Sequence, residues 1–92
     1  MKKLRLLASG RVQGVGFRYA VVNLALDIED LYGRVWNNAD GTVEILVQSE
    51  NSAKLAKFIQ DIRKGPSPMS KVSYLDVTMA NFSDFSDFQV IY

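Results

Sequence analysis

The sequence predicts an α+β sandwich of the ferredoxin-like kind, in which an antiparallel sheet carries two helices on one face and a short extra strand near the C-terminus. Three observations predict it. Stretches of strand-like alternation and of helix-like spacing follow one another in the order βαββαβ. A turn signal in the middle of the chain joins two strands directly into a hairpin. The 92 residues suffice for one domain, residues 1–92, and are too few for two.

The first strand and the first helix are predicted from two different periodicities. Residues 3–9 alternate, with Leu4, Leu6 and Ala8 on one face, which is typical of a half-buried strand. From Phe17 onward, apolar residues recur at helical spacing and predict an amphipathic helix that ends near Asp30. These apolar residues are Val21, Leu24, Ile28 and Leu31.

A hairpin is predicted after this helix. Its first strand alternates between two faces, which hold Gly33, Val35 and Asn37 on one side and Arg34, Trp36 and Asn38 on the other. Residues 38–41, Asn-Ala-Asp-Gly, form a turn signal, and residues 42–48 return as the second strand. The side chains of this strand that face the core are Val43, Ile45 and Val47.

The second half of the chain predicts a helix and two further strands. Asn51 or Ser52 can cap the helix, and residues 65–68, Gly-Pro-Ser-Pro, end it. Its buried stripe consists of Leu55, Phe58, Ile59 and Ile62. Residues 71–79 alternate through Ser73, Leu75 and Val77, and a last short strand follows at Phe88, Val90 and Tyr92. The run 82–88 is interpreted as a loop whose phenylalanines cover the core edge.

Composition excludes several classes of protein. The chain has no cysteine and no histidine, which removes disulfides, thiolate chemistry, histidine triads and ordinary zinc sites, so we expect no metal and no cofactor. A net charge of +1 favours no nucleic-acid partner. No apolar run approaches the roughly 20 residues of a membrane span. Arg5 interrupts an N-terminal apolar segment already too short for a signal peptide, so we expect a cytoplasmic protein.

The junction between the first strand and the first helix is rich in glycine. Residues 10–18 read Gly-Arg-Val-Gln-Gly-Val-Gly-Phe-Arg. Glycine permits positive φ and a close approach of the backbone to a ligand, so successive N–H groups can form one concave cradle. The N-terminus of a helix adds free N–H groups and the positive end of its dipole. Arg18 supplies a planar fork of donors, and the stretch therefore predicts a binding site for phosphate or another anion.

Geometry places an amide beside this cradle. A helix from Arg18 to Asp30 rises about 18 Å at ~1.5 Å per residue. A strand that runs antiparallel to it from Tyr32 to Asn37 returns about 17 Å at ~3.3 Å per residue. Asn37 is therefore expected level with the start of the helix, near Arg18. Its amide oxygen can accept a hydrogen bond from a water molecule while its nitrogen donates to a ligand.

Residues 10–18 closely resemble the signature of the acylphosphatase family. Two further segments agree, Gly-Arg-Val-Trp-Asn at 33–37 with Asp-Gly-Thr-Val-Glu at 40–44, and Gly-Pro-Ser at 65–67. The resemblance covers essentially the whole chain. It implies a small monomeric enzyme that hydrolyses the carboxyl-phosphate bond of acyl phosphates without a metal ion. Which acyl phosphate it uses stays open.

The resemblance also implies roles for individual residues. Arg18 would bind the phosphate, and Asn37 would position the attacking water. The backbone N–H groups of the loop would embrace the phosphoryl oxygens, and these belong to Gln13, Gly14, Val15, Gly16 and Phe17. Such chemistry is consistent with the composition, because phosphoryl transfer is catalysed largely by positioning and by stabilising charge on the equatorial oxygens.

One feature departs from the family pattern. Relatives commonly have an aromatic residue after the glycine and a basic or amide residue just before the asparagine. Here Arg34 and Trp36 stand in the reverse order, on the same face of the strand. We infer that the two roles are exchanged, which bears on substrate preference more than on activity. Taken alone, Trp36 is read as partly buried packing in preference to a platform for substrate.

Two other functions are compatible with parts of the pattern. A non-catalytic anion-binding module would keep the cradle and Arg18 but would not need Asn37. An RNA-binding domain shares the βαββαβ order, yet it requires exposed aromatic residues on central strands and a basic sheet. Residues 42–48 have neither feature. The enzyme is therefore the favoured interpretation.

Overall fold

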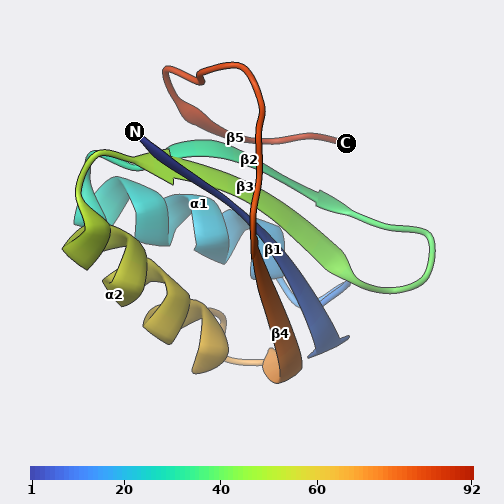
Figure 1. Cartoon of the computed structure of the whole chain (residues 1–92). Coiled ribbons are helices and arrows are strands. Elements are labelled where there is room, and N and C mark those ends of the chain that lie inside the picture. Colours follow the sequence, from blue (N-terminus) through green and yellow to red (C-terminus); the bar gives the residue numbers. More distant parts are fainter.

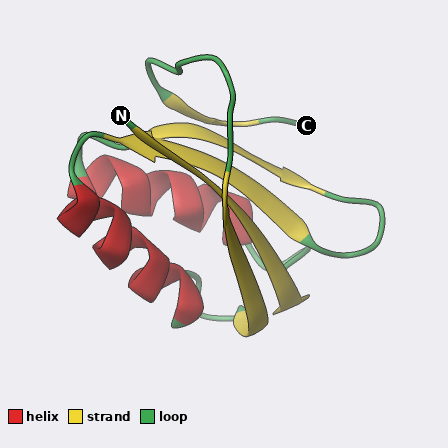
Figure 2. Ribbon diagram, in the orientation of Figure 1, coloured by secondary structure: helices red, strands yellow, loops and turns green.

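The computed structural model describes residues 1–92 and has five strands and two helices (Figures 1 and 2). The order along the chain is β1 (Lys2–Arg11), α1 (Phe17–Ile28), β2 (Tyr32–Asn37), β3 (Val43–Ser49), α2 (Ser52–Arg63), β4 (Lys71–Met79) and β5 (Phe88–Val90). Both helices cover the same face of the sheet, which confirms the predicted ferredoxin-like sandwich. Neither helix has the length and apolar character that a membrane crossing would require.

The strands lie in the order β4-β1-β3-β2-β5, and the last strand differs from the rest. β1 pairs antiparallel with β3 and with β4, and β2 pairs antiparallel with β3. β5 pairs parallel with β2, so the predicted antiparallel pattern holds for four strands and the sheet as a whole is mixed. The reason is topological. The chain leaves β4 at one edge of the sheet, reverses direction over residues 80–87 and reaches the other edge running with β2 (Figure 1).

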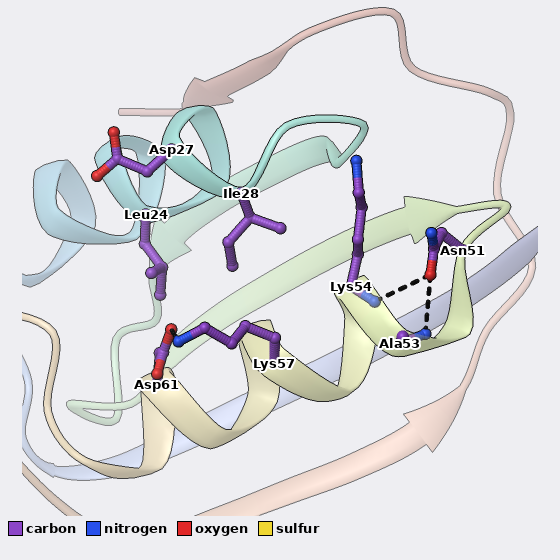
Figure 3. A pocket seen from close by; sticks show the side chains of 8 residues that line it. All are labelled: Leu24, Asp27, Ile28, Asn51, Ala53, Lys54, Lys57 and Asp61. Atoms are coloured by element: carbon purple, nitrogen blue, oxygen red, sulfur yellow. Dashed lines mark hydrogen bonds and ion pairs between the residues drawn. The ribbon is translucent and has the colours of Figure 1, made fainter.

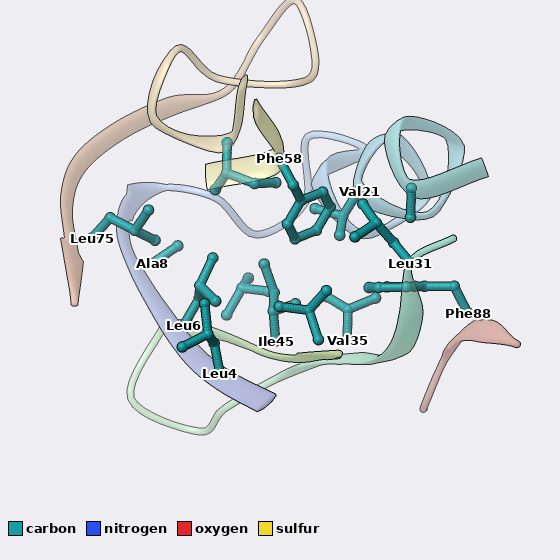
Figure 4. Close-up of a cluster of buried hydrophobic side chains, with 14 of the residues drawn as sticks. Leu4, Leu6, Ala8, Val21, Leu31, Val35, Ile45, Phe58, Leu75 and Phe88 are labelled. Atoms are coloured by element: carbon teal, nitrogen blue, oxygen red, sulfur yellow. The ribbon is translucent and has the colours of Figure 1, made fainter. Parts of the chain in front are cut away.

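The core lies between the sheet and the helices (Figure 4). Leu4, Leu6 and Ala8 of β1 are all buried, as their alternation predicted. The rings of Phe58 from α2 and Phe88 from β5 pack with their centroids 5.9 Å apart. Each large side chain that is fully buried stabilises the fold by roughly 1.5–3 kcal/mol. The helix-covered face of the sheet is therefore the face on which the chain depends for stability.

The two helices have different ends. α1 stops at Ile28, two residues before the predicted end, because Glu29 and Asp30 have φ values of 68° and 58° that no helix continues through. The N–H of Glu29 still donates to the carbonyl of Ala25, 3.0 Å away. At α2 the cap is Asn51 and not Ser52. Its side-chain oxygen accepts hydrogen bonds from the N–H groups of Ala53 and Lys54.

A β-bulge shifts the alternation of β4. Ser9 pairs with Tyr74 and Gly10 pairs with Val72, so one extra residue of β4 lies between them. Ser73 was predicted to share a face with Leu75 and Val77 and is exposed, while Val72 packs against the core in its place. Gly10 has φ 123°, and a Cβ there would lie 2.3 Å from the carbonyl oxygen of Lys71. Gly10 therefore belongs to the bulge and not to an anion cradle.

The phenylalanines of residues 82–88 separate between two faces of the sheet. Phe88 is buried in the core, as predicted for the core edge. Phe82 and Phe85 instead stack on each other, with centroids 5.3 Å apart, beside Lys3 and Arg34 on the helix-free face. For these two the prediction was wrong, because cation–π contacts hold their rings against side chains that alternate away from the core.

Candidate active site

The loop between β1 and α1 has free donors at its surface. We call residues 13–17 the cradle loop. Gly14 and Gly16 have φ values of 73° and 76°, which glycine adopts without strain, and both are exposed. Val12 just before the loop and Phe17 at its end are each 1% exposed and anchor it in the core. No backbone N–H of the cradle loop donates a hydrogen bond within the protein.

The start of α1 adds to this supply of donors. Gly16 is the N-cap residue, and no side chain caps the helix. The first N–H groups of the helix therefore remain available, together with the positive end of the helix dipole. Loop and helix start together form a surface that suits an anion with several oxygens.

Arg18 lies in the first turn of α1 and carries an unpaired charge. The four ion pairs of the protein involve Lys3, Arg5, Arg34 and Lys57, and none involves Arg18. Its guanidinium carbon lies 5.1 Å from the ring centroid of Tyr92. A guanidinium that stacks on a ring keeps its planar fork of N–H donors free at the edges. Arg18 is therefore available to an anion bound at the cradle loop.

Tyr92 links Arg18 to the end of β2. β5 runs parallel to β2 with Val90 opposite Val35, and the N–H of Ile91 donates to the carbonyl of Val35 at 2.9 Å. Because parallel strands advance together, Tyr92 lies near the end of β2, where Asn37 stands. The hydroxyls of Tyr92 and Tyr19 are 2.6 Å apart. This hydrogen bond raises the pKa of Tyr92.

Asn37 is the last residue of β2 and alternates with Gly33 and Val35, of which Val35 is buried in the core, so it lies on the core-facing side of that strand. It pairs with Val43, which in turn pairs with Ala8 of β1, so it lies at the end of the sheet from which β1 leads into the cradle loop. Its side-chain oxygen is buried and has no hydrogen-bond partner in the protein. An unpartnered buried oxygen costs about 1–3 kcal/mol, so its presence calls for an explanation.

Gln13 joins the cradle loop to the hairpin that carries Asn37. Its side-chain Nε2 donates to the carbonyl oxygens of Asn38 and Thr42, each at 2.9 Å. Sequence analysis gave Gln13 only a backbone role, and its side-chain role was missed. No periodicity could have revealed it, because the contact joins residues 25 and 29 positions apart.

The hairpin turn is also held from the helix-free face of the sheet. Trp36 Nε1 donates to Asn38 Oδ1 at 3.1 Å, and Asn38 Nδ2 donates to Glu44 Oε1 at 3.1 Å. Arg5 Nε lies 2.6 Å from Glu44 Oε2. The hydrogen bond from Arg5, with a smaller contribution from that of Asn38, lowers the pKa of Glu44. Trp36, half-buried, thus acts as a packing and hydrogen-bonding residue.

Arg34, the other residue of the exchanged pair, serves a different part of the structure. Its Nη1 lies 2.8 Å from Asp87 Oδ1, and its guanidinium carbon lies 4.5 Å from the ring centroid of Phe85. It therefore holds the segment that leads into β5. In this structure Arg34 and Trp36 have distinct partners along the same strand face.

The hollows of the protein surface lie away from Arg18, Asn37 and the cradle loop. The most prominent is an open groove of about 540 Å³ between α1 and α2, where Leu24 and Ile28 of α1 face Lys54 and Lys57 of α2 (Figure 3). None of the three hollows is lined by Arg18, Asn37 or a residue of the cradle loop. No three acidic side chains lie close enough together to hold a metal ion. The candidate site is thus a surface cradle rather than a deep cavity.

Comparison with known proteins gives consistent matches over the whole chain. A family model described as acylphosphatase matches residues 4–90. An acylphosphatase of Lactococcus lactis is 49% identical over 98 residues, and the alignment covers 100% of both chains.

Solved structures agree with the sequence comparison. The crystal structure of an acylphosphatase from Bacillus subtilis matches with a TM-score of 0.92 and 39% identity, covering 100% of both chains. The structure of an acylphosphatase from Coxiella burnetii matches with a TM-score of 0.89 and 29% identity, covering 98% of this chain and 92% of that one.

Proposed function

The chain belongs to the acylphosphatase family, and from this premise we propose that it hydrolyses acyl phosphates to a carboxylate and inorganic phosphate by direct attack of water on phosphorus. The whole chain would act as one domain. The observation that carries the proposal is the buried, unpartnered side-chain oxygen of Asn37 at the end of the sheet where the cradle loop begins.

The phosphoryl group binds at the cradle loop. Its oxygens accept hydrogen bonds from backbone N–H groups of Gln13, Gly14, Val15, Gly16 and Phe17, none of which has a partner within the protein. Arg18 adds the only full positive charge that we assign to the site. Its guanidinium has no carboxylate partner, so binding an anion there costs no existing ion pair.

Asn37 holds the water that attacks. Its side-chain oxygen accepts a hydrogen bond from the water and turns a lone pair of the water oxygen toward phosphorus. As the new P–O bond forms, the bond between phosphorus and the acyl oxygen breaks and the carboxylate leaves with the electron pair. The proton released by the water passes to an oxygen of the phosphoryl group. A carboxylate needs no protonation to depart, so the reaction requires no protein acid.

The charge that develops in the transition state lies on the equatorial phosphoryl oxygens. Backbone N–H groups and one guanidinium can stabilise it without reorganising, because their positions are set by the fold. The chain has no histidine and no cysteine to act as nucleophile or metal ligand. We therefore propose that hydrolysis does not depend on a metal ion.

The proposal is tested by hydrolysis of benzoyl phosphate in ¹⁸O-labelled water with excess EDTA. The wild type should release benzoate well above the spontaneous rate, with the label in phosphate and not in benzoate. An Arg18→Met variant should lose about 100-fold or more in kcat/KM, while the matched control Arg63→Met, at the exposed end of α2, keeps its activity. Folded wild type with no rate above background would instead indicate a non-catalytic anion-binding module. Label in benzoate would contradict attack on phosphorus.

A further inference from the structure

We propose that the side chain of Gln13 is a positioning residue, which fixes Asn37 and its water relative to the phosphoryl group in the cradle. The inference rests on the proposed function and deepens it. Sequence analysis assigned Gln13 one backbone donor in the cradle. The structure assigns its side chain to a second task, because that side chain hydrogen-bonds the β2–β3 turn.

The contacts of Gln13 have the form of a clamp. Both hydrogens of Nε2 are used, one on the carbonyl of Asn38 and one on that of Thr42, each at 2.9 Å. These two residues face each other across the turn, since the N–H of Asn38 donates to the carbonyl of Thr42 at 2.8 Å. A donor that bridges both sides restricts the turn to one arrangement, which a single hydrogen bond would not do.

The clamp acts directly next to Asn37. Asn38, whose carbonyl is held, is the following residue in the chain, so the clamp restrains the backbone one residue beyond Asn37. Apart from Gln13, the side chains that bond Asn38 belong to the hairpin itself: Trp36, Thr42 and Glu44. Gln13 is thus the side chain that couples this hairpin to the cradle loop.

Apart from the Gln13 clamp and the contact of Tyr92 with Arg18, the two halves of the site are joined through the sheet and the core. The cradle loop follows β1, and Asn37 ends β2, with β3 lying between those strands. Small rotations of adjacent strands would separate the phosphoryl group from the water by fractions of an ångström. A misplacement of about 1 Å can reduce turnover by about 100-fold. Loss of the clamp should therefore affect turnover and leave anion binding in place.

Gln13→Met tests this role, because methionine keeps the length of the side chain and removes both donors. Gln60→Met is the matched control, since Gln60 is exposed on α2 and its side chain makes no hydrogen bond. For each protein we would measure kcat with benzoyl phosphate and the competitive inhibition constant of inorganic phosphate. Gln13→Met should lower kcat about tenfold or more. The inhibition constant should change less than about threefold, because the backbone donors and Arg18 remain.

A double-mutant cycle distinguishes positioning of Asn37 by Gln13 from a general loss of structure in the Gln13 variant. If Gln13 acts through Asn37, then Gln13→Met should lower kcat little further in the Asn37→Ala background. Fully additive effects would overturn the inference. Equal losses in kcat and in phosphate binding would overturn it too, as would an unchanged kcat. An inactive, folded wild type would contradict the proposed function itself, so the two failures are distinguishable. Gln13→Asn, which is too short to reach both carbonyls, must show the same kcat loss if Gln13→Met does not fold.

Discussion

The guanidinium carbon of Arg18 lies 5.1 Å from the ring centroid of Tyr92, so a residue from the far end of the chain packs on the cationic residue of the candidate site. The hydroxyl of Tyr92 is in turn 2.6 Å from that of Tyr19, one residue after Arg18. Ring and hydroxyl together restrict where the guanidinium can go. Arg18 is thereby held against a neutral ring while it has no acidic partner.

Replacing Tyr92 by leucine should weaken phosphate binding. The ring attracts the guanidinium at an exposed position, and its loss should raise the inhibition constant of inorganic phosphate about two- to fivefold. Tyr92→Phe keeps the ring and loses only the hydroxyl contact with Tyr19, so it should bind phosphate more tightly than Tyr92→Leu. Tyr74→Leu is the control, because Tyr74 is an exposed tyrosine of β4 whose side chain makes no hydrogen bond. Equal inhibition constants for the two leucine variants would contradict a role for the Tyr92 ring.

Alanine substitutions should distinguish a structural glycine from a cradle glycine. A Cβ at Gly10 would lie 2.3 Å from the carbonyl oxygen of Lys71, whereas a Cβ at Gly14 would meet nothing within 4 Å. Gly10→Ala should lower the free energy of unfolding by more than about 3 kcal/mol. Gly14→Ala should lower the free energy of unfolding by only about 1–2 kcal/mol, because the positive φ at this position is strained for alanine. Urea denaturation followed by circular dichroism measures both, and the reverse order would refute this assignment.

The predictable parts of this fold are those that follow from local periodicity. Alternation in β1 and helical spacing in α2 depend on neighbouring residues, and the buried residues there were all predicted, although Ile59 of the predicted α2 stripe is only partly buried. Ser73 was misplaced because a bulge depends on the partner strand. The parallel pairing of β5 depends on the route of a loop across the whole sheet.

The candidate site likewise has parts that local sequence patterns predict and parts that they do not. A glycine-rich loop before a helix is a local pattern, and Asn37 could be placed from the lengths of two elements. The Gln13 clamp and the contact of Tyr92 with Arg18 join segments that are distant in sequence, 25 to 74 positions apart. No local pattern encodes such contacts, so one sequence alone could not predict them.

The cap of α2 is tested by comparing two adjacent residues. The side-chain oxygen of Asn51 accepts hydrogen bonds from two N–H groups of the first turn. Asn51→Ala should therefore lower the free energy of unfolding by about 1 kcal/mol, the usual loss for an N-cap. Ser52 is the first helical residue and caps nothing, so Ser52→Ala should have a much smaller effect. A larger loss for Ser52→Ala in urea denaturation would show that the cap is assigned to the wrong residue.

Glu44 should contribute to the loss of stability in acid. The hydrogen bond from Arg5 lowers the pKa of Glu44 in the folded protein, so folding favours the ionised form. Its contribution is fully present above the pKa of the unfolded chain and is lost as the pH falls through the lowered folded value. Glu44→Gln should lower the Tm at pH 7 by a few degrees, because a partly exposed ion pair is worth about 1 kcal/mol or less.

The measurement that checks this is a series of thermal unfolding curves from pH 7 to pH 2. The difference in Tm between wild type and Glu44→Gln should shrink as the pH falls. Glu50→Gln serves as the control, because Glu50 is exposed and forms no ion pair. A difference that is constant with pH would mean that the charge of Glu44 does not matter.

The most direct test of the whole account is the effect of Asn37→Ala on two constants measured together. If Asn37 holds the attacking water, kcat with benzoyl phosphate should fall about 100-fold or more. The inhibition constant of inorganic phosphate should stay within about threefold, because the cradle loop and Arg18 are unchanged. Asn23→Ala, at an exposed asparagine of α1, should match the wild type in both constants. A kcat that survives the loss of Asn37, or one that falls in parallel with phosphate binding, would contradict the assignment of the water to this residue.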